Sequence, residues 1–116
     1  MNVLIVSPGQ PPKARDIGED LSVMQSVVGG PIQAVYPFED PVALICHEEG
    51  KLLGLPLNRC LRSEENGEIY DIIAGTFFLC AAPPDSDCFQ SLSSEQIQRY
   101  TKRFQFPEYF PEISYN

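Results

Sequence analysis

The sequence predicts a small α+β domain, made of a mostly antiparallel sheet of about five strands, two helices and a packed aromatic C-terminal tail. Short apolar segments alternate with Gly, Pro, Asn and Asp turns, as is typical of antiparallel sheets. Two other segments repeat apolar residues at helical spacing. The 116 residues fit one domain. We expect the sheet and first helix over 1–82, a linker over 83–92, a C-terminal helix over 93–106 and the tail over 107–116.

The first strand is predicted over Val3 to Val6, an apolar run that stops before Ser7-Pro8. The segment that follows contains three prolines and cannot join a ladder, because proline has no backbone N–H. Ala14 to Ile17 is expected to return as a short strand, which would close a wide hairpin.

A helix is predicted next, with the apolar residues of one face at helical spacing: Leu21, Met24, Val27 and Val28. Glu19 and Asp20 are expected in its first turn, where negative charge complements the helix dipole. Gly29 and Gly30 end the helix, because glycine adopts the left-handed conformation of a C-terminal cap without strain. No phosphate-binding loop is predicted here, because the glycine pair follows a helix and does not open one.

Three strands are predicted between residues 32 and 55, and an irregular connection follows them. Ile32 to Phe38 and Val42 to Cys46 are expected as strands. Residues 48–50, Glu-Glu-Gly, have the chemistry of a three-residue hairpin turn. The chain should then return as a strand over Lys51 to Leu55. Leu57 to Ser63 alternates poorly, and we expect it to be an irregular or briefly helical connection.

The last predicted strand, Ile69 to Ala82, follows a strong hairpin signal at Asn66-Gly67. Its residues are apolar at both odd and even positions. A strand of this kind is central and covered on both faces. Gly75, inside it, indicates a bulge or a close approach of another backbone.

The C-terminal helix has a clear start, because Ser93 and Gln96 have the spacing of a capping box. It must end before Pro107. The aromatic tail is expected to pack on the domain, over the second face of the central strand. The alternative is a docking segment for a partner protein, with Tyr109 and Phe110 as the contact residues.

The charge of the chain disfavours several functions. Sixteen acidic residues against 8 basic ones give a net charge of −8. Direct binding to nucleic acid or an anionic membrane depends on Lys and Arg and is not expected. The acidic surface is expected to provide solubility; the alternative is a mimic of DNA that occupies a nucleic-acid-binding protein.

The start of the chain and its apolar runs predict a cytoplasmic protein. The opening segment MNVLIVSPG has no basic region before its short apolar run, so we interpret it as a strand and not as a signal peptide. No apolar run approaches the length of a membrane span. Thiols stay reduced in the cytoplasm.

The cysteines do not form a pattern typical of a metal site, and we expect neither a metal nor a cofactor. None of them belongs to a C-x-x-C pair, and His47 is the single histidine. Cys46 and Cys80 lie in apolar runs and are expected to be buried and inert. Cys88 lies in a polar segment and should be exposed and reactive. His47 is expected to be a solvated turn residue.

No catalytic set is recognisable, but five residues are candidates for binding. Asn58, Arg59 and Arg62 lie in one predicted connection, and arginine is suited to binding anions. The structural alternative is an ion pair between one of these arginines and a nearby glutamate. Tyr36 could present an aromatic ring to a ligand at a strand end. Asp71 could act as an acid, although such a residue more often caps or pairs locally.

Several segments in order resemble an uncharacterised family, the domain-of-unknown-function family 3846, found in phages, plasmids and conjugative elements of bacteria. The similarity covers roughly residues 1–80 and rests on the segments Met24 to Gly30, Glu48 to Leu52, Gly54 to Arg59 and Asp71 to Phe78. Many members have a larger residue than Pro31 after the glycine pair, and a glutamate where this chain has Gln33. The resemblance implies an accessory protein of a mobile element and implies no activity, because none is established for the family.

The function we expect is that of a non-enzymatic protein-binding module, with recognition at Pro56 to Arg62 and the tail as a second candidate. The partner is an unidentified protein; a homodimer formed through an open sheet edge is another alternative. Two other functions stay open. One is the anti-restriction or anti-defence DNA mimic. The other is a small nucleotide- or metabolite-binding sensor or enzyme, which requires a pocket holding Asn58, Arg59 and Asp71.

Overall fold

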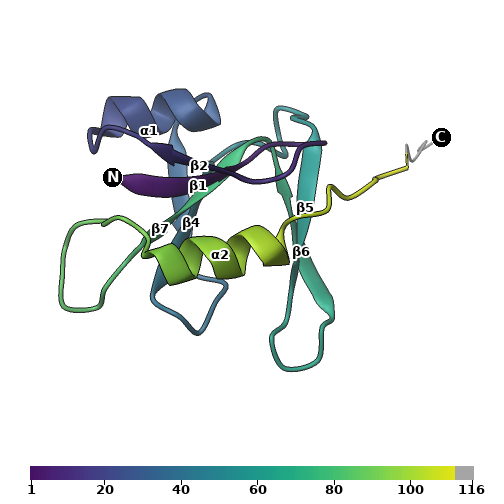
Figure 1. Cartoon of the computed structure of the whole chain (residues 1–116). Coiled ribbons are helices and arrows are strands. Elements are labelled where there is room, and N and C mark those ends of the chain that lie inside the picture. Colours follow the sequence, from purple (N-terminus) through teal and green to yellow (C-terminus); the bar gives the residue numbers. More distant parts are fainter. Residues whose placement is uncertain (112–116) are drawn as a thin grey trace.

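The computed structural model describes residues 1–111 and confirms the α+β class with two helices. Its main sheet has five strands, as expected, and a second sheet of two strands brings the number over these residues to seven (Figure 1). The elements in chain order are β1 Asn2–Val6, β2 Lys13–Asp16, α1 Leu21–Val28, β3 Ile32–Val35, β4 Val42–His47, β5 Leu57–Arg62, β6 Ile69–Ala74, β7 Phe77–Ala81 and α2 Ser94–Arg103.

The five-stranded sheet has the order β2-β1-β7-β4-β3, and every neighbouring pair in it is antiparallel. Leu79 of β7 lies between Leu4 of β1 and Leu44 of β4. All five residues of β7 are buried. The prediction of a central strand covered on both faces is therefore confirmed for this segment. The two outer strands, β2 and β3, leave one edge each without a partner strand in residues 1–111.

The apolar run Ile69 to Ala82 is two strands, so its prediction as one strand is wrong. The chain turns at Gly75, which has a φ of 83°. A Cβ at this position would lie 2.9 Å from Cδ1 of Leu55. Glycine is therefore required both for the backbone conformation and for the close packing. β6 leaves the main sheet and pairs with β5 instead.

The assignment of residues 51–63 is also wrong. Lys51 to Leu55 forms a series of turns, and the strand is Leu57–Arg62. The alternation of β5 is obscured because two of its buried residues are polar, Asn58 and Arg59. The hairpin signal at Asn66-Gly67 is confirmed, since β5 and β6 are joined there and Gly67 has a φ of 74°.

The ends of two elements also differ from the prediction. Glu19 and Asp20 precede α1, because the helix begins at Leu21 with Asp20 as its N-cap. Gly29 ends α1 as expected, with a φ of 88° and its N–H donating to the carbonyl of Gln25 at 2.8 Å. The predicted strand over Ile32 to Phe38 ends at Val35, the last residue paired with β4.

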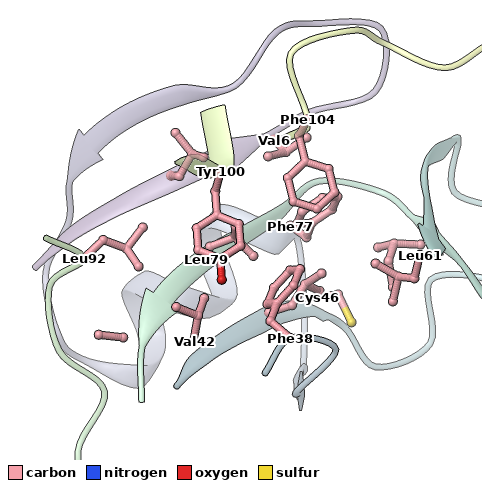
Figure 2. Close-up of a cluster of buried hydrophobic side chains, with 14 residues drawn as sticks. Val6, Phe38, Val42, Cys46, Leu61, Phe77, Leu79, Leu92, Tyr100 and Phe104 are labelled. Atoms are coloured by element: carbon pink, nitrogen blue, oxygen red, sulfur yellow. The ribbon is translucent and has the colours of Figure 1, made fainter. Parts of the chain in front are cut away.

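The main sheet separates two cores. One lies under α1 and contains Val3, Met24, Val28, Ala43, Ile45, Phe78 and Cys80. The other is covered by α2 and includes Leu4, Val6, Leu44, Leu61, Phe77, Leu79, Tyr100 and Phe104 (Figure 2). Successive residues of β4 and β7 enter opposite cores because side chains alternate along a strand.

An aromatic cluster covers the second face of the sheet. The ring of Phe38 lies 4.8 Å from that of Tyr100, and the ring of Phe104 lies 5.6 Å from that of Phe77 (Figure 2). The cover therefore comes from α2 and its C-cap, and the described part of the predicted tail, 107–111, contributes no residue to this core. Tyr109 of the tail is 88% exposed. The tail residues 112–116 lie outside the described part of the chain.

The predicted capping box of α2 is confirmed. Ser93 Oγ accepts from the N–H of Gln96 at 3.1 Å, and Gln96 Oε1 accepts from the N–H of Ser93 at 2.9 Å. The helix ends at Arg103, before Pro107, with Phe104 as its C-cap. Neither α1 nor α2, the helices described within residues 1–111, is long and apolar enough to cross a membrane.

Candidate functional site

The five predicted binding residues lie in three different places. Asn58, Arg59 and Arg62 are on β5, Tyr36 follows β3, and Asp71 is on β6. Asn58 and Arg59 are buried, at 0% and 1% exposure, whereas the Arg62 side chain is half-exposed. The β5 residues form one group, which neither Tyr36 nor Asp71 joins.

The side chain of Asn58 connects the two sheets. Its Nδ2 donates to the carbonyl of Val6, at the end of β1, and to the carbonyl of Gly75, at the break before β7, both at 2.8 Å. Its Oδ1 accepts from Nη1 of Arg59 at 2.8 Å. Buried polar groups need such partners. Those of Asn58 all belong to its own chain, so the residue holds β5 against the main sheet.

The guanidinium of Arg59 makes five hydrogen bonds, all to uncharged oxygens. It donates to the carbonyls of Gln10, Asn58 and Phe104, and to Oδ1 of Asn58. An arginine has five N–H donors, so none is left for a ligand. Arg59 forms no ion pair with a carboxylate of residues 1–111. Burial lowers the pKa of Arg59, and the charge of Glu108 opposes this shift.

The tail contributes Glu108 to this side of the molecule. One oxygen of its carboxylate, Oε2, accepts from the main-chain N–H of Cys60, and the other, Oε1, accepts from Nη2 of Arg62 at 3.2 Å. We call these two donors the β5 clasp. β6 is the one strand paired with β5 within residues 1–111, and the N–H of Cys60 donates to Glu108, so this N–H is on the outer edge of β5. In Figure 1 the tail leaves α2 and passes β5.

The clasp opens into a hollow of about 230 Å³, which we call the arginine groove. Its formal charges are three positive and one negative, in a chain whose net charge is −8. Arg62 is ion-paired with Glu108 and Arg103 with Glu64, so within residues 1–111 Arg59 carries the unpaired positive charge at this place on an acidic protein. The groove is lined by Arg59, Cys60, Arg62, Arg103, Phe104, Phe106 and Glu108.

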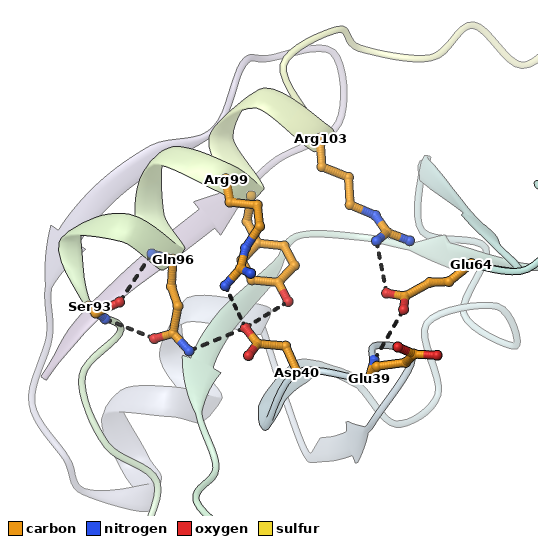
Figure 3. A network of polar contacts seen from close by, with 8 residues as sticks. Glu39, Asp40, Glu64, Ser93, Gln96, Arg99 and Arg103 are labelled. Atoms are coloured by element: carbon orange, nitrogen blue, oxygen red, sulfur yellow. Dashed lines mark hydrogen bonds and ion pairs between the residues drawn. The ribbon is translucent and has the colours of Figure 1, made fainter.

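Two polar networks fix α2 and position Arg103 at the groove (Figure 3). In the first, Oδ2 of Asp40 accepts from Gln96, Arg99 and Tyr100, the shortest of these bonds being 2.8 Å to Arg99. Burial raises the pKa of Tyr100 to about 12, with a further contribution from the Asp40 charge.

The second network joins α2 to the β5–β6 hairpin. Glu64 accepts from Nη1 of Arg103 at 3.1 Å and from the N–H of Glu39 at 3.3 Å (Figure 3). The Arg103 guanidinium also lies 4.8 Å from the centre of the Phe38 ring. Arg103 is therefore held by a carboxylate and an aromatic face at once.

Asp71 lines a separate hollow of about 160 Å³, which shares no residue with the arginine groove. Its Oδ1 accepts from Nζ of Lys51 and from the N–H of Ile72. The pocket that the sensor or enzyme alternative requires would hold Asn58, Arg59 and Asp71 together. Among the hollows lined by the described residues, none does so.

Tyr36 is 63% exposed and faces an open hollow beside the β5–β6 hairpin. Tyr70 of β6 lines the same hollow and is 57% exposed. Phe38, two residues after Tyr36, is buried in the aromatic cluster. Of the two aromatic residues at this strand end, one therefore belongs to the core and the other remains at the surface.

The predicted docking residues of the tail differ in burial. Tyr109 is exposed, and Phe110 is half-buried. The residue between Pro107 and Tyr109, Glu108, makes the polar contacts of the tail with β5. Sequence reasoning missed Glu108. A signal was present, because the triplet Phe-Pro-Glu occurs twice, at 106–108 and 110–112.

The burial predicted for the cysteines is confirmed, but that of His47 is wrong. Cys46 and Cys80 are buried, and Cys88 is exposed. His47 is 7% exposed, and its Nδ1 accepts from the N–H of Glu49 at 2.9 Å. Its ring occupies the space that a side chain at Gly30 would need. Within residues 1–111, no three His, Cys, Asp or Glu side chains are arranged to hold a metal ion.

The fold and the groove define a small α+β domain with an arginine-lined edge strand. A family model described as a domain of unknown function (DUF3846) matches residues 1–105, and the chain belongs to this family. The match covers both sheets and both helices but not Glu108. No curated protein and no solved structure matches the chain. Membership of this family does not assign an activity to the chain.

Proposed function

We propose that the chain is a cytoplasmic, non-enzymatic protein-binding module whose recognition site is the outer edge of β5. The observation that supports this proposal is the position of Glu108. A residue of an extended, proline-containing segment is held by a main-chain N–H of β5 and by Arg62. Edge strands bind extended peptides through their unpaired N–H and C=O groups, with side-chain sites providing specificity.

The site lies where sequence reasoning expected recognition, at Pro56 to Arg62, but its parts have different roles. Asn58 and Arg59 are interior and hold the strand in place, so the groups offered to a partner are the Cys60 N–H and Arg62. A rigid strand is a better platform for recognition than the irregular connection that was expected.

A non-enzymatic role is favoured by the state of the candidate catalytic groups. Asp71 is paired with Lys51, and Nδ1 of His47 is occupied by the N–H of Glu49. The two side chains line one hollow, but each has a structural partner. The arginine groove contains one carboxylate, Glu108, which is itself bound.

An accessory role in a mobile element is the expectation attached to the family, and we retain it as part of the proposal. The anti-defence DNA mimic remains a second prediction. It requires a row of free carboxylates, and five acidic residues among 1–111 are ion-paired: Asp16, Asp40, Glu64, Asp71 and Glu108.

The test is affinity capture from a nuclease-treated lysate of the native host, with the full chain and two charge-reversal variants. Arg62→Glu alters the clasp, and Lys102→Glu makes the same change of charge on the exposed face of α2. A host protein captured by the full chain and by Lys102→Glu, but lost with Arg62→Glu, supports the proposal. Equal capture by all three places recognition elsewhere.

The tail is tested separately as the contact surface. A variant with Tyr109→Ala and Phe110→Ala removes both aromatic side chains and leaves Glu108 in place. Loss of the captured protein with this variant, while Arg62→Glu retains it, would assign docking to the tail.

A further inference from the structure

We infer that the β5 clasp is a carboxylate-binding site for an extended acidic segment of a partner protein, and that Glu108 is the internal competitor which the partner must displace. This inference rests on the proposed function and deepens it, because it names the chemistry of the partner and the control of the site.

The geometry of the clasp suits a carboxylate. Each oxygen of Glu108 has its own donor, a main-chain N–H for Oε2 and a guanidinium nitrogen for Oε1. Charge-assisted hydrogen bonds of this kind are about twice as strong as neutral ones. The Glu108 side chain is 27% exposed, so the clasp covers most of it.

The two donors that hold Glu108 suit a carboxylate better than a phosphate. A phosphate presents three or more oxygens and needs a larger set of N–H donors. Arg59 cannot supply them, because its five donors are bound to carbonyl and amide oxygens. Arg103 is engaged with Glu64. Glu108 uses one N–H of Cys60 and one of Arg62, and two donors in this arrangement match the two oxygens of a glutamate or aspartate.

The buried positive charge of Arg59 favours an anion at the clasp, whether or not Glu108 is bound there. Arg59 is 1% exposed, and among residues 1–111 it has no carboxylate in ion-pair contact. Its positive charge acts through the protein interior, where screening by salt is weak. If Glu108 leaves, Arg59 and Arg62 remain without a neutralising carboxylate in the groove. The groove would then attract a second carboxylate.

The tail is a tethered ligand, since Glu108 follows the C-cap residue Phe104 by four positions. A short tether gives a high local concentration of its ligand. An outside segment then binds only the fraction of molecules in which the tail has left. If the tail occupies the clasp for about nine-tenths of the time, it weakens outside binding about tenfold.

The thiol of Cys60 reports whether the clasp is filled. Burial raises its pKa, and Glu108 raises it further through its charge and a hydrogen bond. Loss of the Glu108 carboxylate therefore increases the thiolate fraction of Cys60. Cys88, exposed and distant in the sequence, serves as an internal reference for the reaction with iodoacetamide.

The experiment measures binding of a fluorescent synthetic peptide with the sequence of residues 105–112 to the full chain and its variants. Glu108→Gln keeps the size of the side chain but removes its charge and one of its two acceptor oxygens, which weakens its hold on the clasp. Glu19→Gln, on the exposed segment before α1, is the matched control for the change of charge. Arg62→Gln removes one donor of the clasp. Urea unfolding and the alkylation ratio of Cys60 to Cys88 are recorded for each variant.

The expected result is binding about tenfold tighter to Glu108→Gln than to the unaltered chain or to Glu19→Gln. A peptide with both glutamates replaced by glutamine should bind at least about tenfold more weakly, as should the original peptide to the double variant Glu108→Gln/Arg62→Gln. The Cys60 alkylation ratio should rise in Glu108→Gln and fall again when the peptide is added.

Three results would overturn the inference. They are the absence of binding to every variant, equal binding of the glutamate and glutamine peptides, and displacement by inorganic phosphate as effective as displacement by unlabelled peptide. The last would assign the site to free anions. In each case the proposed function would still hold if capture of a host protein depends on Arg62. Failure of the inference and failure of the proposed function are therefore distinguishable.

Discussion

Arg59 binds the C-terminal end of α2 through the carbonyl of Phe104, to which its Nε and Nη2 donate at 3.3 and 3.0 Å. The last carbonyls of a helix have no intrahelical donor and carry partial negative charge. Arg59, a buried cation from the second sheet, supplies the missing donor and a positive charge that complements the helix end. One side chain therefore joins β5, the loop at Gln10 and the helix that covers the second core.

Replacement of Arg59 should cause a large loss of stability. Arg59→Met keeps the length of the side chain but leaves the carbonyls of Phe104 and Gln10 without this donor. We expect a decrease in the free energy of unfolding of about 3 kcal/mol, measured by urea denaturation. Arg62→Met is the control and should cost less than about 1 kcal/mol, because its ion pair with Glu108 is half-exposed. Equal losses would contradict the structural role of Arg59.

The contact between Gly30 and His47 predicts an energetic coupling. A Cβ at Gly30 would overlap the His47 ring, so Gly30→Ala should destabilise the fold by about 1 to 3 kcal/mol. The same substitution should cost much less in a His47→Ala background. Gly29→Ala is the control, because a Cβ there meets no atom within 4 Å and the cost comes from its φ of 88°. Its cost should be unaffected by His47→Ala in a double-mutant cycle.

Stability should fall at alkaline pH because two buried groups resist ionisation. Burial raises the pKa of Cys80 from 9.0 to about 12, and that of Tyr100 from 10.0 to about 12. Both groups bind their proton more tightly in the folded chain. Their contribution is therefore complete below pH 9.0 for Cys80 and below pH 10.0 for Tyr100, and it is lost as the pH rises to about 12.

The variant Tyr100→Phe tests this prediction. It should remove about 2 to 3 kcal/mol of the loss in unfolding free energy between pH 10.0 and about 12, because phenylalanine does not ionise. Denaturant unfolding is measured at several pH values with tyrosinate absorbance as a second signal. An unchanged alkaline slope would show that Tyr100 is not one of the groups responsible.

Alkylation of the folded chain should be selective. Cys88 should react first with iodoacetamide, since it is exposed, and Cys46 and Cys80 should react only when the structure opens. Mass spectrometry of the digested protein gives the extent at each position. In urea above the unfolding midpoint, the four cysteines should react at similar rates. Early modification of Cys80 in the folded chain would contradict its position in the core.

The sequence predicted the parts of the fold that follow local rules. The capping box at Ser93, the left-handed cap at Gly29 and the turn at Asn66-Gly67 depend on a few neighbouring residues. The buried strand β7 was found from its uninterrupted apolar residues. These features need no knowledge of distant contacts.

The part that could not be predicted depends on polar groups whose partners are far away in the chain. Asn58 and Arg59 are buried because Val6, Gln10, Gly75 and Phe104 provide their hydrogen-bond partners. Polar residues are mostly exposed, so Leu57–Arg62 did not have the pattern of a buried strand. Gly75 was expected to be a bulge or a close approach, but its neighbour Leu55 and the pairing of β6 with β5 are not visible in the local sequence.

The candidate site was predicted only in part, because its polar partners also lie far apart in the chain. Arg62 was identified as a side chain suited to anions, and the nearby glutamates were considered as its structural partners. The carboxylate that it binds is Glu108, 46 positions away in the chain. The other donor is the main-chain N–H of Cys60, which the type of side chain at this position cannot predict.

The pairing of β1 with β7 has a consequence for synthesis on the ribosome. β1 emerges before the other described strands, but its inner neighbour in the sheet is more than seventy residues later, with Leu4 opposite Leu79. The hairpin β1–β2 and the pair β3–β4 can form early, yet they cannot join until Phe77–Ala81 is inserted between them. Non-local pairing of this kind slows folding. The nascent chain must therefore keep two apolar strand edges apart until its seventh strand is available.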